Sequence, residues 1–168
     1  MKSISPDQYI LDEPYPKVIL QPSDRKYACM LSDIYAGKGS ETTAIAQYRV
    51  HVHYLTDLPQ IHKAYEGIAG AEMIHQDLLG NLICEMGASP ILLSGVTNCY
   101  WNGIFPDYQC RLPAILESDA QGERNAIAHY TRIANCVTNT SLQALIYRII
   151  QDEQLHLKFL LSLLDEYE

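Results

Sequence analysis

The chain has 168 residues, of which 48% are hydrophobic, and it carries a formal net charge of −8. This length suits one domain with a sizeable core, and the negative charge argues against binding to a nucleic-acid backbone. No apolar run reaches the roughly 20 residues that span a bilayer, and residues 1–21 lack the apolar region of a secretory signal peptide, so a cytoplasmic location is expected.

Residues 1–22 are predicted to form an extended arm. Proline fixes the backbone angle φ and lacks an amide hydrogen, which disfavours helix. The prolines of this segment are Pro6, Pro14, Pro16 and Pro22. The arm is expected to pack on the rest of the chain or on a neighbouring molecule, while residues 23–168 are predicted to form a single helical domain.

A first helical stretch is predicted from about residue 24 to about Thr56. Gly37-Lys38-Gly39 interrupts it, which indicates a kink or a local bulge of the kind that often accompanies functional sites. After the glycines, residues recur at steps of four and three, the stripe of a packed helix. The stripe consists of Glu41, Ile45, Tyr48, Val52 and Leu55.

A second helix is predicted from about Pro59 to Met86. The turn before it is short, so the two helices should be antiparallel neighbours. Glu72 and His75 occupy positions of its apolar stripe where a packed helix normally has leucine. Residues three apart lie about 60° apart around a helix and point to one side. A buried carboxylate without a partner costs several kcal/mol, a cost that a bound divalent ion would offset.

Residues 88–111 contain turn-forming residues and no helical pattern. A connector of about 24 residues can extend roughly 80 Å, whereas the second helix is only ~40 Å long. The connector can therefore cross the whole bundle. Its aromatic residues indicate either a loop packed down by its side chains or a lid or dimer contact at one end of the bundle. They are Tyr100, Trp101, Phe105 and Tyr108.

Two further helices, predicted at about Pro113–Val137 and 141–166, repeat the pattern of the first pair about 81 residues later. The chain is therefore predicted to be an internal duplication of a helical hairpin, over about residues 30–87 and 112–166. The repeated residues are Glu41, Tyr48, Glu72 and His75 in the first half and Glu123, Tyr130, Glu153 and His156 in the second.

Four carboxylates and two imidazoles on four helices are the ligand set of a dinuclear metal centre inside a four-helix bundle. Such donors suit iron and manganese alike. The alternative is that these are polar residues at the surface or the core edge, aligned by chance; the duplication argues against it. The predicted metal ligands are Glu41, Glu72, His75, Glu123, Glu153 and His156.

Tyr48 and Tyr130 lie seven residues after a ligand glutamate, on the same helix face. Each phenol is expected either to hydrogen-bond and orient a ligand carboxylate or to pack in the core with its hydroxyl satisfied elsewhere. Asp152 is expected either to accept a hydrogen bond from a ligand histidine or to face solvent. Surface or edge positions are predicted for the remaining histidines, which are His51, His53, His62 and His129.

The five cysteines include no Cys-x-x-Cys pair, so the chain has no rubredoxin-type iron site. Cys29, Cys84 and Cys136 fall in predicted helices and are expected to be reduced and mostly buried. Cys99 and Cys110 share one loop and could pair under oxidation.

The duplicated glutamate, tyrosine and histidine pattern resembles the ferritin-like superfamily, and within it the rubrerythrin and bacterioferritin branch, over about residues 30–165. The resemblance implies an all-α, ferritin-like four-helix bundle with one long crossover between its second and third helices. It also implies a centre of two iron or two manganese ions, with one histidine on each. Peroxidase-type rubrerythrins carry an additional carboxylate where this chain has Ala126, which counts against their peroxidase chemistry.

The function implied is an oxidoreductase that reduces peroxide or O₂ in oxidative-stress defence, with electrons from an external donor. The alternatives are a ferroxidase or iron-handling protein, a manganese catalase-like enzyme, and a non-enzymatic metal-binding coat or assembly protein. A homodimer is expected, because apolar residues lie outside the core stripes and two-fold dimers are the commonest soluble assemblies. Those residues are Val50, Tyr54, Ile83, Trp101 and Phe105. A cage is not expected, because the chain stops at Glu168 without the fifth helix of storage ferritins.

Overall fold

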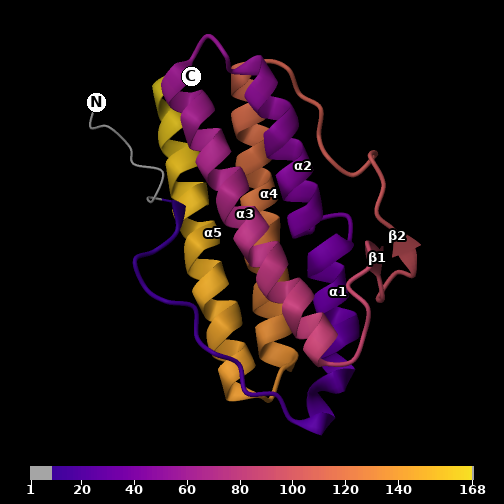
Figure 1. Cartoon of the computed structure of the whole chain (residues 1–168). Coiled ribbons are helices and arrows are strands. Elements are labelled where there is room, and N and C mark those ends of the chain that lie inside the picture. The colour runs from indigo at the N-terminus through magenta and orange to yellow at the C-terminus, as the bar shows by residue number, and fades with distance from the viewer. Residues whose placement is uncertain (1–8, 168) are drawn as a thin grey trace.

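The computed structural model describes residues 9–167, which form a bundle of long helices (Figure 1). The helices are η2 (Pro22–Tyr27), α1 (Ala28–Ala36), α2 (Glu41–His51), η3 (Val52–Tyr54), α3 (Pro59–Glu85), α4 (Leu112–Cys136) and α5 (Thr140–Tyr167). Because α1 and α2 follow one another along one side, the architecture is an all-α four-helix bundle with one long crossover, which confirms the predicted fold. None of the helices within residues 9–167 is long and apolar enough to cross a membrane.

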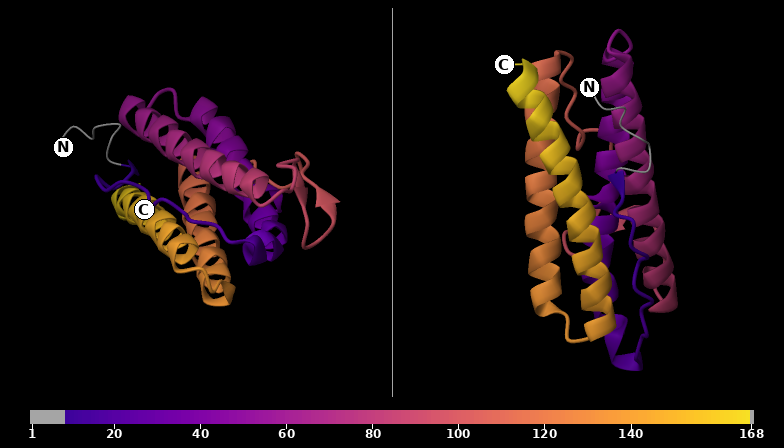
Figure 2. Two further views of the ribbon diagram at one scale, coloured as in Figure 1. Left: turned by 60° about the horizontal axis from the view of Figure 1, so that its bottom comes forward. Right: turned by 90° about the vertical axis from the view of Figure 1, so that its left-hand side faces the viewer.

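The bundle consists of two antiparallel hairpins that lie side by side (Figure 2). One hairpin pairs α2 with α3, and the other pairs α4 with α5. Pro59 is the first residue of α3, a position where the missing amide hydrogen of proline costs nothing. The short turns fix the helices of each hairpin as neighbours, and the connector between α3 and α4 joins the two hairpins.

The predicted interruption near Gly37 separates α1 from α2. A Cβ atom on Gly37 would lie 2.5 Å from the carbonyl oxygen of Asp33, so the tight end of α1 requires glycine. The Ser40 side chain then caps α2 by accepting a hydrogen bond from the Thr43 amide at 3.4 Å, as serine commonly does at this position. The break places Glu41 in the first turn of a new helix.

The apolar core is divided into two clusters on either side of a polar centre. One cluster includes Leu31, Leu79, Ile133, Leu142 and Ile146. The other includes Leu55, Tyr65, Ile68, Ile115 and Leu160. The buried charged residues between them are thus held by well-packed helices on both sides.

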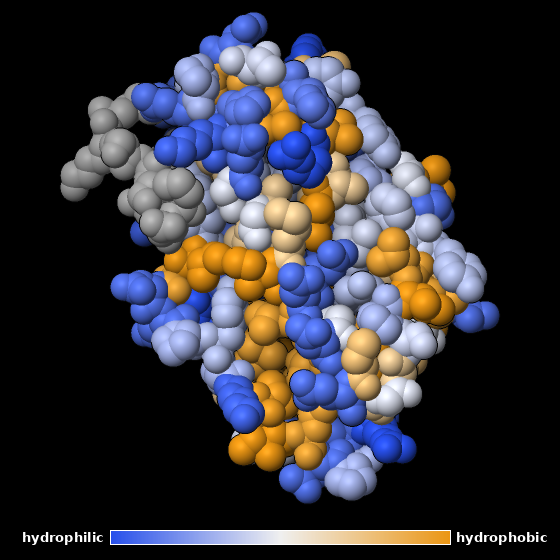
Figure 3. Space-filling view, in the orientation of Figure 1, coloured by the Kyte–Doolittle hydropathy of each residue, from blue (hydrophilic) through white to orange (hydrophobic). Residues whose placement is uncertain are grey.

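The connector between α3 and α4 contains a small antiparallel hairpin that the sequence did not predict, formed by β1 (Leu93–Ser94) and β2 (Cys99–Tyr100). After the hairpin, the connector packs against α2. There Trp101 Nε1 donates a hydrogen bond to Thr43 Oγ1 at 3.0 Å, and the Asp107 amide donates to Gln47 Oε1 at 2.6 Å. Several of its apolar side chains remain exposed, and Figure 3 shows such side chains on the side where Figure 1 places the connector.

Residues 9–21, called the strap below, run across α5 and α3 before η2 begins (Figures 1 and 2). The Ile19 amide donates a hydrogen bond to Ser141 Oγ at 2.9 Å, and Val18 and Leu20 pack on the core. The first part of the predicted arm, residues 1–8 with Pro6, lies outside the described residues.

The expectations about the burial of the cysteines and of Ile83 were wrong. All five cysteines are exposed and free, including Cys29, Cys84 and Cys136. At the end of α3 the buried positions around Cys84 are taken by larger apolar residues, Leu82, Ile83 and, directly after the helix, Met86, so the thiol is directed outward. The sequence had suggested that Ile83 belongs to a dimer surface. Ile83 is only 1% exposed, so it belongs to the core instead.

Candidate metal centre

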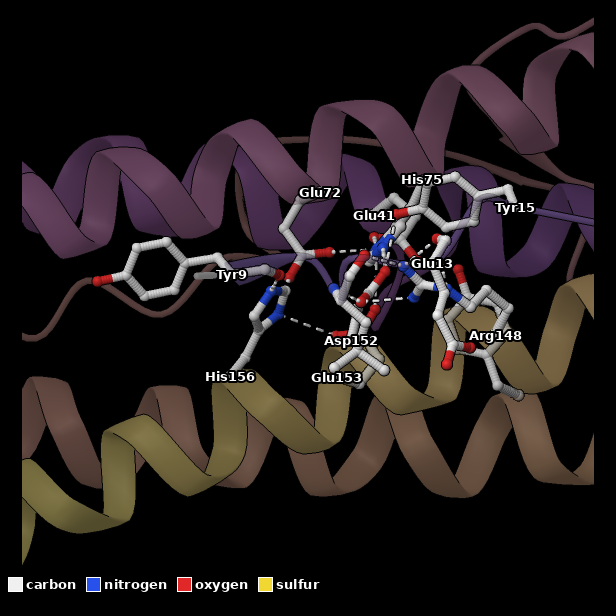
Figure 4. Close-up of polar contacts among 12 residues, drawn as sticks. Tyr9, Glu13, Tyr15, Glu41, Glu72, His75, Arg148, Asp152, Glu153 and His156 are labelled. Carbon is white, nitrogen blue, oxygen red and sulfur yellow. Dashed lines mark hydrogen bonds and ion pairs between the residues drawn. The ribbon is translucent and has the colours of Figure 1, made fainter. Parts of the chain in front are cut away.

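All six predicted ligand side chains meet in the middle of the bundle, between the two apolar clusters (Figure 4). Helix α2 contributes Glu41, α3 contributes Glu72 and His75, α4 contributes Glu123, and α5 contributes Glu153 and His156. None of the six is more than 4% exposed. Glutamate and histidine three residues apart on α3 and on α5 point to one side of their helix, which is why two hairpins bring all six together.

These side chains form two overlapping groups, each of which could hold one metal ion. The first group is Glu41, Glu72, His75 and Glu153; the second is Glu72, Glu123, Glu153 and His156. Within each group one donor atom from every residue lies within 4.8 Å of the others. Glu72 and Glu153 belong to both groups, so they occupy the middle of the centre.

Both imidazoles direct Nδ1 toward these two shared carboxylates. His75 Nδ1 lies 3.0 Å from Glu153 Oε1 and 3.2 Å from Glu72 Oε2. His156 Nδ1 lies 3.1 Å from Glu72 Oε1 and 3.4 Å from Glu153 Oε2. The two rings therefore face the centre with the same nitrogen.

The electrostatics of the metal-free centre favour extra protons. Burial raises the pKa of Glu41 and of Glu123 well above the usual range, and the charges of neighbouring glutamates raise both further. Burial alone would lower the pKa of His75 and of His156, but the surrounding carboxylates outweigh it and raise both pKa values well above 6.5. In the metal-free centre the four carboxylates thus have too few positive charges nearby to balance their own negative charge.

Several buried donor atoms lack a hydrogen-bond partner among residues 9–167. They are Glu72 Oε1, Glu153 Oε1, Glu153 Oε2 and His156 Nδ1. They lie close to one another, as the distances above show, but without the geometry of a hydrogen bond, and carboxylate oxygens left so in a dry core are costly. Oxygen and imidazole donors in this arrangement fit a pair of divalent cations.

Tyr48 and Tyr130 cross between the two hairpins. The Tyr48 hydroxyl donates a hydrogen bond to Glu123 on α4, and the Tyr130 hydroxyl donates to Glu41 on α2. Burial first, and then the charges of nearby carboxylates, raise the pKa of both phenols well above 10, so both remain donors. Each tyrosine therefore donates to a carboxylate of the predicted ligand set, but on the opposite hairpin and not on its own helix.

Asp152 is fully buried, which contradicts a solvent-facing role. Its Oδ2 lies 3.3 Å from His75 Nε2, at the side of the ring turned away from the centre. This is the contact that the sequence had suggested for it.

A cavity of about 70 Å³ leads to the centre between α2 and α4. Glu41, Glu72, Glu123 and Glu153 form its inner wall. Small residues form much of the outer wall, namely Gly39, Ala44, Gly122 and Ala126. Because Gly122 is exposed, the cavity gives small molecules a path from solvent to the carboxylates.

A buried pair beside this cavity was missed by sequence reasoning. His51 Nδ1 lies 2.9 Å from Asp119 Oδ2, both side chains are completely buried, and Gln47 Nε2 donates to Asp119 Oδ1 at 2.7 Å. The predicted surface position of His51 is therefore wrong, because α2 is covered on a second face by α4. Asp119 carried a usable signal, since it stands four residues before Glu123 on the same helix face. His129 lies at the rim of the cavity, 3.2 Å from Asp33.

Replacing Asp119 with alanine is expected to lower the free energy of unfolding by roughly 2–4 kcal/mol, because it leaves His51 and Gln47 buried without their partner. Urea denaturation of the metal-free protein measures this change. Glu117→Ala, at an exposed position of the same helix, is the control and should change stability by less than about 0.5 kcal/mol. Equal stability of the two variants would mean that the pair does not support the fold.

The rubrerythrin family model matches residues 37–164. No curated protein matches the chain. Among solved structures, a manganese catalase from Anabaena PCC7120 aligns with a TM-score of 0.81 at 16% identity, over 94% of this chain and 79% of that one. The bacterioferritin of Desulfovibrio desulfuricans, described with a diiron site, aligns with a TM-score of 0.72 at 25% identity, over 88% and 84% of the two chains.

A third similar structure is the dodecameric thioferritin of Bacteroides fragilis, with a TM-score of 0.68 at 20% identity over 86% of this chain and 88% of that one. The three proteins share the bundle architecture with this chain, and two of them are described by the metal they use. Their metals differ, so the shared fold alone does not select manganese or iron.

Proposed function

The chain belongs to the rubrerythrin family and is a ferritin-like protein of the dinuclear metal-carboxylate type. From this we propose that it is an oxidoreductase that reduces peroxide or O₂ at a pair of iron ions. The observation that carries the proposal is the set of six buried donors with two shared carboxylates, reached by a small cavity. Oxidative-stress defence is the role that this chemistry would serve.

The overlap of the two groups supports a specific arrangement of ligands. Glu41 and His75 would hold one ion, and Glu123 and His156 would hold the other. Glu72 and Glu153 would contribute to both ions, since each belongs to both groups.

A bound pair of ions would supply the two-electron redox chemistry, and the chain's own residues would shape the site around it. Tyr48 and Tyr130 hold Glu123 and Glu41 in place by donating hydrogen bonds. The cavity of about 70 Å³ has room for a molecule the size of O₂ or hydrogen peroxide, since one water needs roughly 10–15 Å³. Electrons would come from a donor outside this bundle, because residues 1–168 contain no Cys-x-x-Cys pair.

A second candidate, a manganese catalase-like enzyme, is favoured by the symmetry of the centre. Each group has one histidine and one unshared glutamate, and Ala126 stands where peroxidase-type rubrerythrins carry a further carboxylate. Disproportionation of peroxide needs no electron donor. The two candidates therefore differ in their need for a reductant.

Loading the metal-free protein with Fe²⁺ or with Mn²⁺ and then adding hydrogen peroxide tests both candidates. Peroxide consumption by the iron form that depends on an added reductant, without release of O₂, supports the oxidoreductase. Release of O₂ by the manganese form without a reductant supports the catalase. If neither form consumes peroxide or O₂ faster than the free ions do, both proposals fail, and an iron-handling or structural role is left.

We also propose that the chain forms a homodimer. Support comes from exposed apolar side chains on the connector, on the side visible in Figure 3. They include Ile91, Val96, Tyr100 and Ile104, and isolated proteins rarely leave such a group uncovered. Light scattering on the metal-loaded protein is expected to give twice the 19.0 kDa mass of one chain. Ile104→Ser, at a position that is 81% exposed, should shift the mass toward that of one chain. A mass of a dozen or more chains would contradict the dimer.

A further inference from the structure

The strap contacts the side of the metal centre opposite the cavity. Its residues 9–21 lie outside the part of the chain matched by the family model, residues 37–164. Yet His156 Nε2 donates a hydrogen bond to the main-chain carbonyl oxygen of Tyr9 at 2.8 Å. A carbonyl oxygen is only an acceptor, so this contact keeps a hydrogen on Nε2 of His156.

The strap reaches the second imidazole through Asp152. Asp152 lies beside His75 Nε2, and the strap holds its carboxylate at both oxygens. The Leu11 amide donates to Oδ1 at 2.8 Å and the Tyr15 hydroxyl donates to Oδ2 at 2.7 Å. These two contacts fix the position of the group that faces the outer nitrogen of His75.

Arg148 ties the strap to the same carboxylate. Its Nη1 lies 2.6 Å from Asp152 Oδ1, while Nη2 donates to the carbonyl oxygens of Leu11 and Glu13 at 2.7 and 2.9 Å. The Arg148 side chain is only 4% exposed, so a buried charge on α5 depends on main-chain atoms of the strap for all its partners except Asp152. Figure 4 shows the strap residues on either side of the two imidazoles.

Tyr9 anchors the beginning of the strap between α3 and α5. Its ring is 3% exposed and meets the Phe159 ring edge-on at 5.5 Å. On the other side it lies against Gly67, where an added Cβ would come within 2.5 Å of the ring. Glycine at this position of α3 therefore leaves the space that the tyrosine fills.

We propose that the strap positions both imidazoles of the metal centre so that Nδ1 faces the metal ions. It also covers the face of the bundle between α3 and α5. A neutral imidazole has one nitrogen that donates and one that accepts. Acceptors placed at Nε2 of both rings leave the Nδ1 lone pairs for metal, as outer partners of ligand histidines do. With that face covered, the cavity between α2 and α4 is the route by which small molecules approach. This inference rests on the metal centre proposed above.

Gly67→Ala tests the strap without altering any strap residue or ligand. Alanine is the better helix former, but its Cβ would lie within 2.5 Å of the Tyr9 ring, so the strap has to move. The displaced strap is expected to weaken binding of Mn²⁺ by about 10–100-fold, the usual cost of losing an outer partner of a ligand. Equilibrium dialysis with metal analysis gives the affinity. Gly70→Ala is the matched control, because no described atom lies within 4 Å of a Cβ added there.

A second pair of variants acts on the other imidazole. Tyr15→Phe removes one hydrogen bond to Asp152 and should weaken Mn²⁺ binding in the same direction. Tyr147→Phe, at an exposed position of α5, should not. Electron paramagnetic resonance of the manganese-loaded protein gives a second measurement, which does not depend on the stability of the fold. In Gly67→Ala and Tyr15→Phe the signal of a coupled ion pair should be replaced by that of isolated ions. Hydrogen exchange of residues 9–15 should rise in Gly67→Ala.

The outcomes separate this inference from the proposed function. If the natural protein binds no pair of Mn²⁺ or Fe²⁺ ions, the metal centre itself is wrong. If it binds a pair and both Gly67→Ala and Tyr15→Phe keep the affinity within about twofold and the coupled signal, the strap has no part in the centre. Weaker binding in both, with both controls unchanged, supports it.

Discussion

Glu153→Ala is expected to abolish binding of both metal ions. Glu153 belongs to both groups of donors, and among residues 9–167 its two carboxylate oxygens contact the ligand histidines without making a hydrogen bond. Its removal therefore takes one donor from each ion. Loss of an outer partner already costs about 10–100-fold in metal affinity, so loss of a shared ligand should cost more, and metal-dependent activity should fall with it.

The other glutamates make the test more specific. Glu72→Ala should behave like Glu153→Ala, because Glu72 is also shared. Glu41→Ala should lower the affinity for one ion more than for the other, since Glu41 belongs to only one group. Glu166→Ala, at an exposed position of α5, is the control. Metal analysis after dialysis gives the number of ions per chain, and two ions retained in Glu153→Ala would refute the shared arrangement.

The duplicated spacing predicted the fold and the six converging side chains because both depend on helix geometry alone. Residues at steps of three and four share a helix face, and two hairpins of this kind bring their polar positions to the same level. The break at Gly37 was visible because two glycines stand one residue apart in Gly37-Lys38-Gly39, whereas an isolated glycine such as Gly80 does not interrupt α3.

Contacts made across the bundle were harder to predict. Spacing placed Tyr48 on the same face as Glu41, but not opposite Glu123, which accepts its hydrogen bond. His51 was misplaced because a helical wheel identifies one buried face, and α2 has two. Asp119 stood at a position of the apolar stripe of α4 and could have been noticed there.

The sequence predicted an extended arm but not its contacts to the centre. The Tyr9 carbonyl, the Leu11 amide and the Glu13 carbonyl make most of them, and main-chain atoms leave no signature in a sequence. The Tyr15 hydroxyl is the one side chain of the strap that donates to Asp152. Gly67 is a partial signal, because a glycine within an apolar helix indicates that another group approaches closely. The sequence does not show which group that is.

Metal loading is expected to raise the melting temperature by about 10 °C or more, and by more at pH 8 than at pH 5.5. An ion at 1,000 times its dissociation constant stabilises the folded state by about 4 kcal/mol, and each kcal/mol is worth about 2–4 °C for a protein of this size. Differential scanning calorimetry of the metal-free and metal-loaded protein measures the difference. Glu153→Ala should show little metal-dependent shift.

The dependence on pH follows from the protons that the metal-free centre holds. Glu41 and Glu123 have pKa values raised above 4.5 in the folded state, and His75 and His156 have pKa values raised above 6.5. The folded protein therefore binds more protons than the unfolded chain, so these groups stabilise it at low pH and their contribution is lost as the pH rises through the folded values.

Glu72 and Glu153 have lowered pKa values, and their contribution is complete above about 4.5, so it does not change between pH 5.5 and 8. The metal-free protein should thus become less stable over this range. Metal ions take the place of those protons, and their binding strengthens as the pH rises. If the two forms melt together at both pH values, the six side chains hold no metal that matters to the fold.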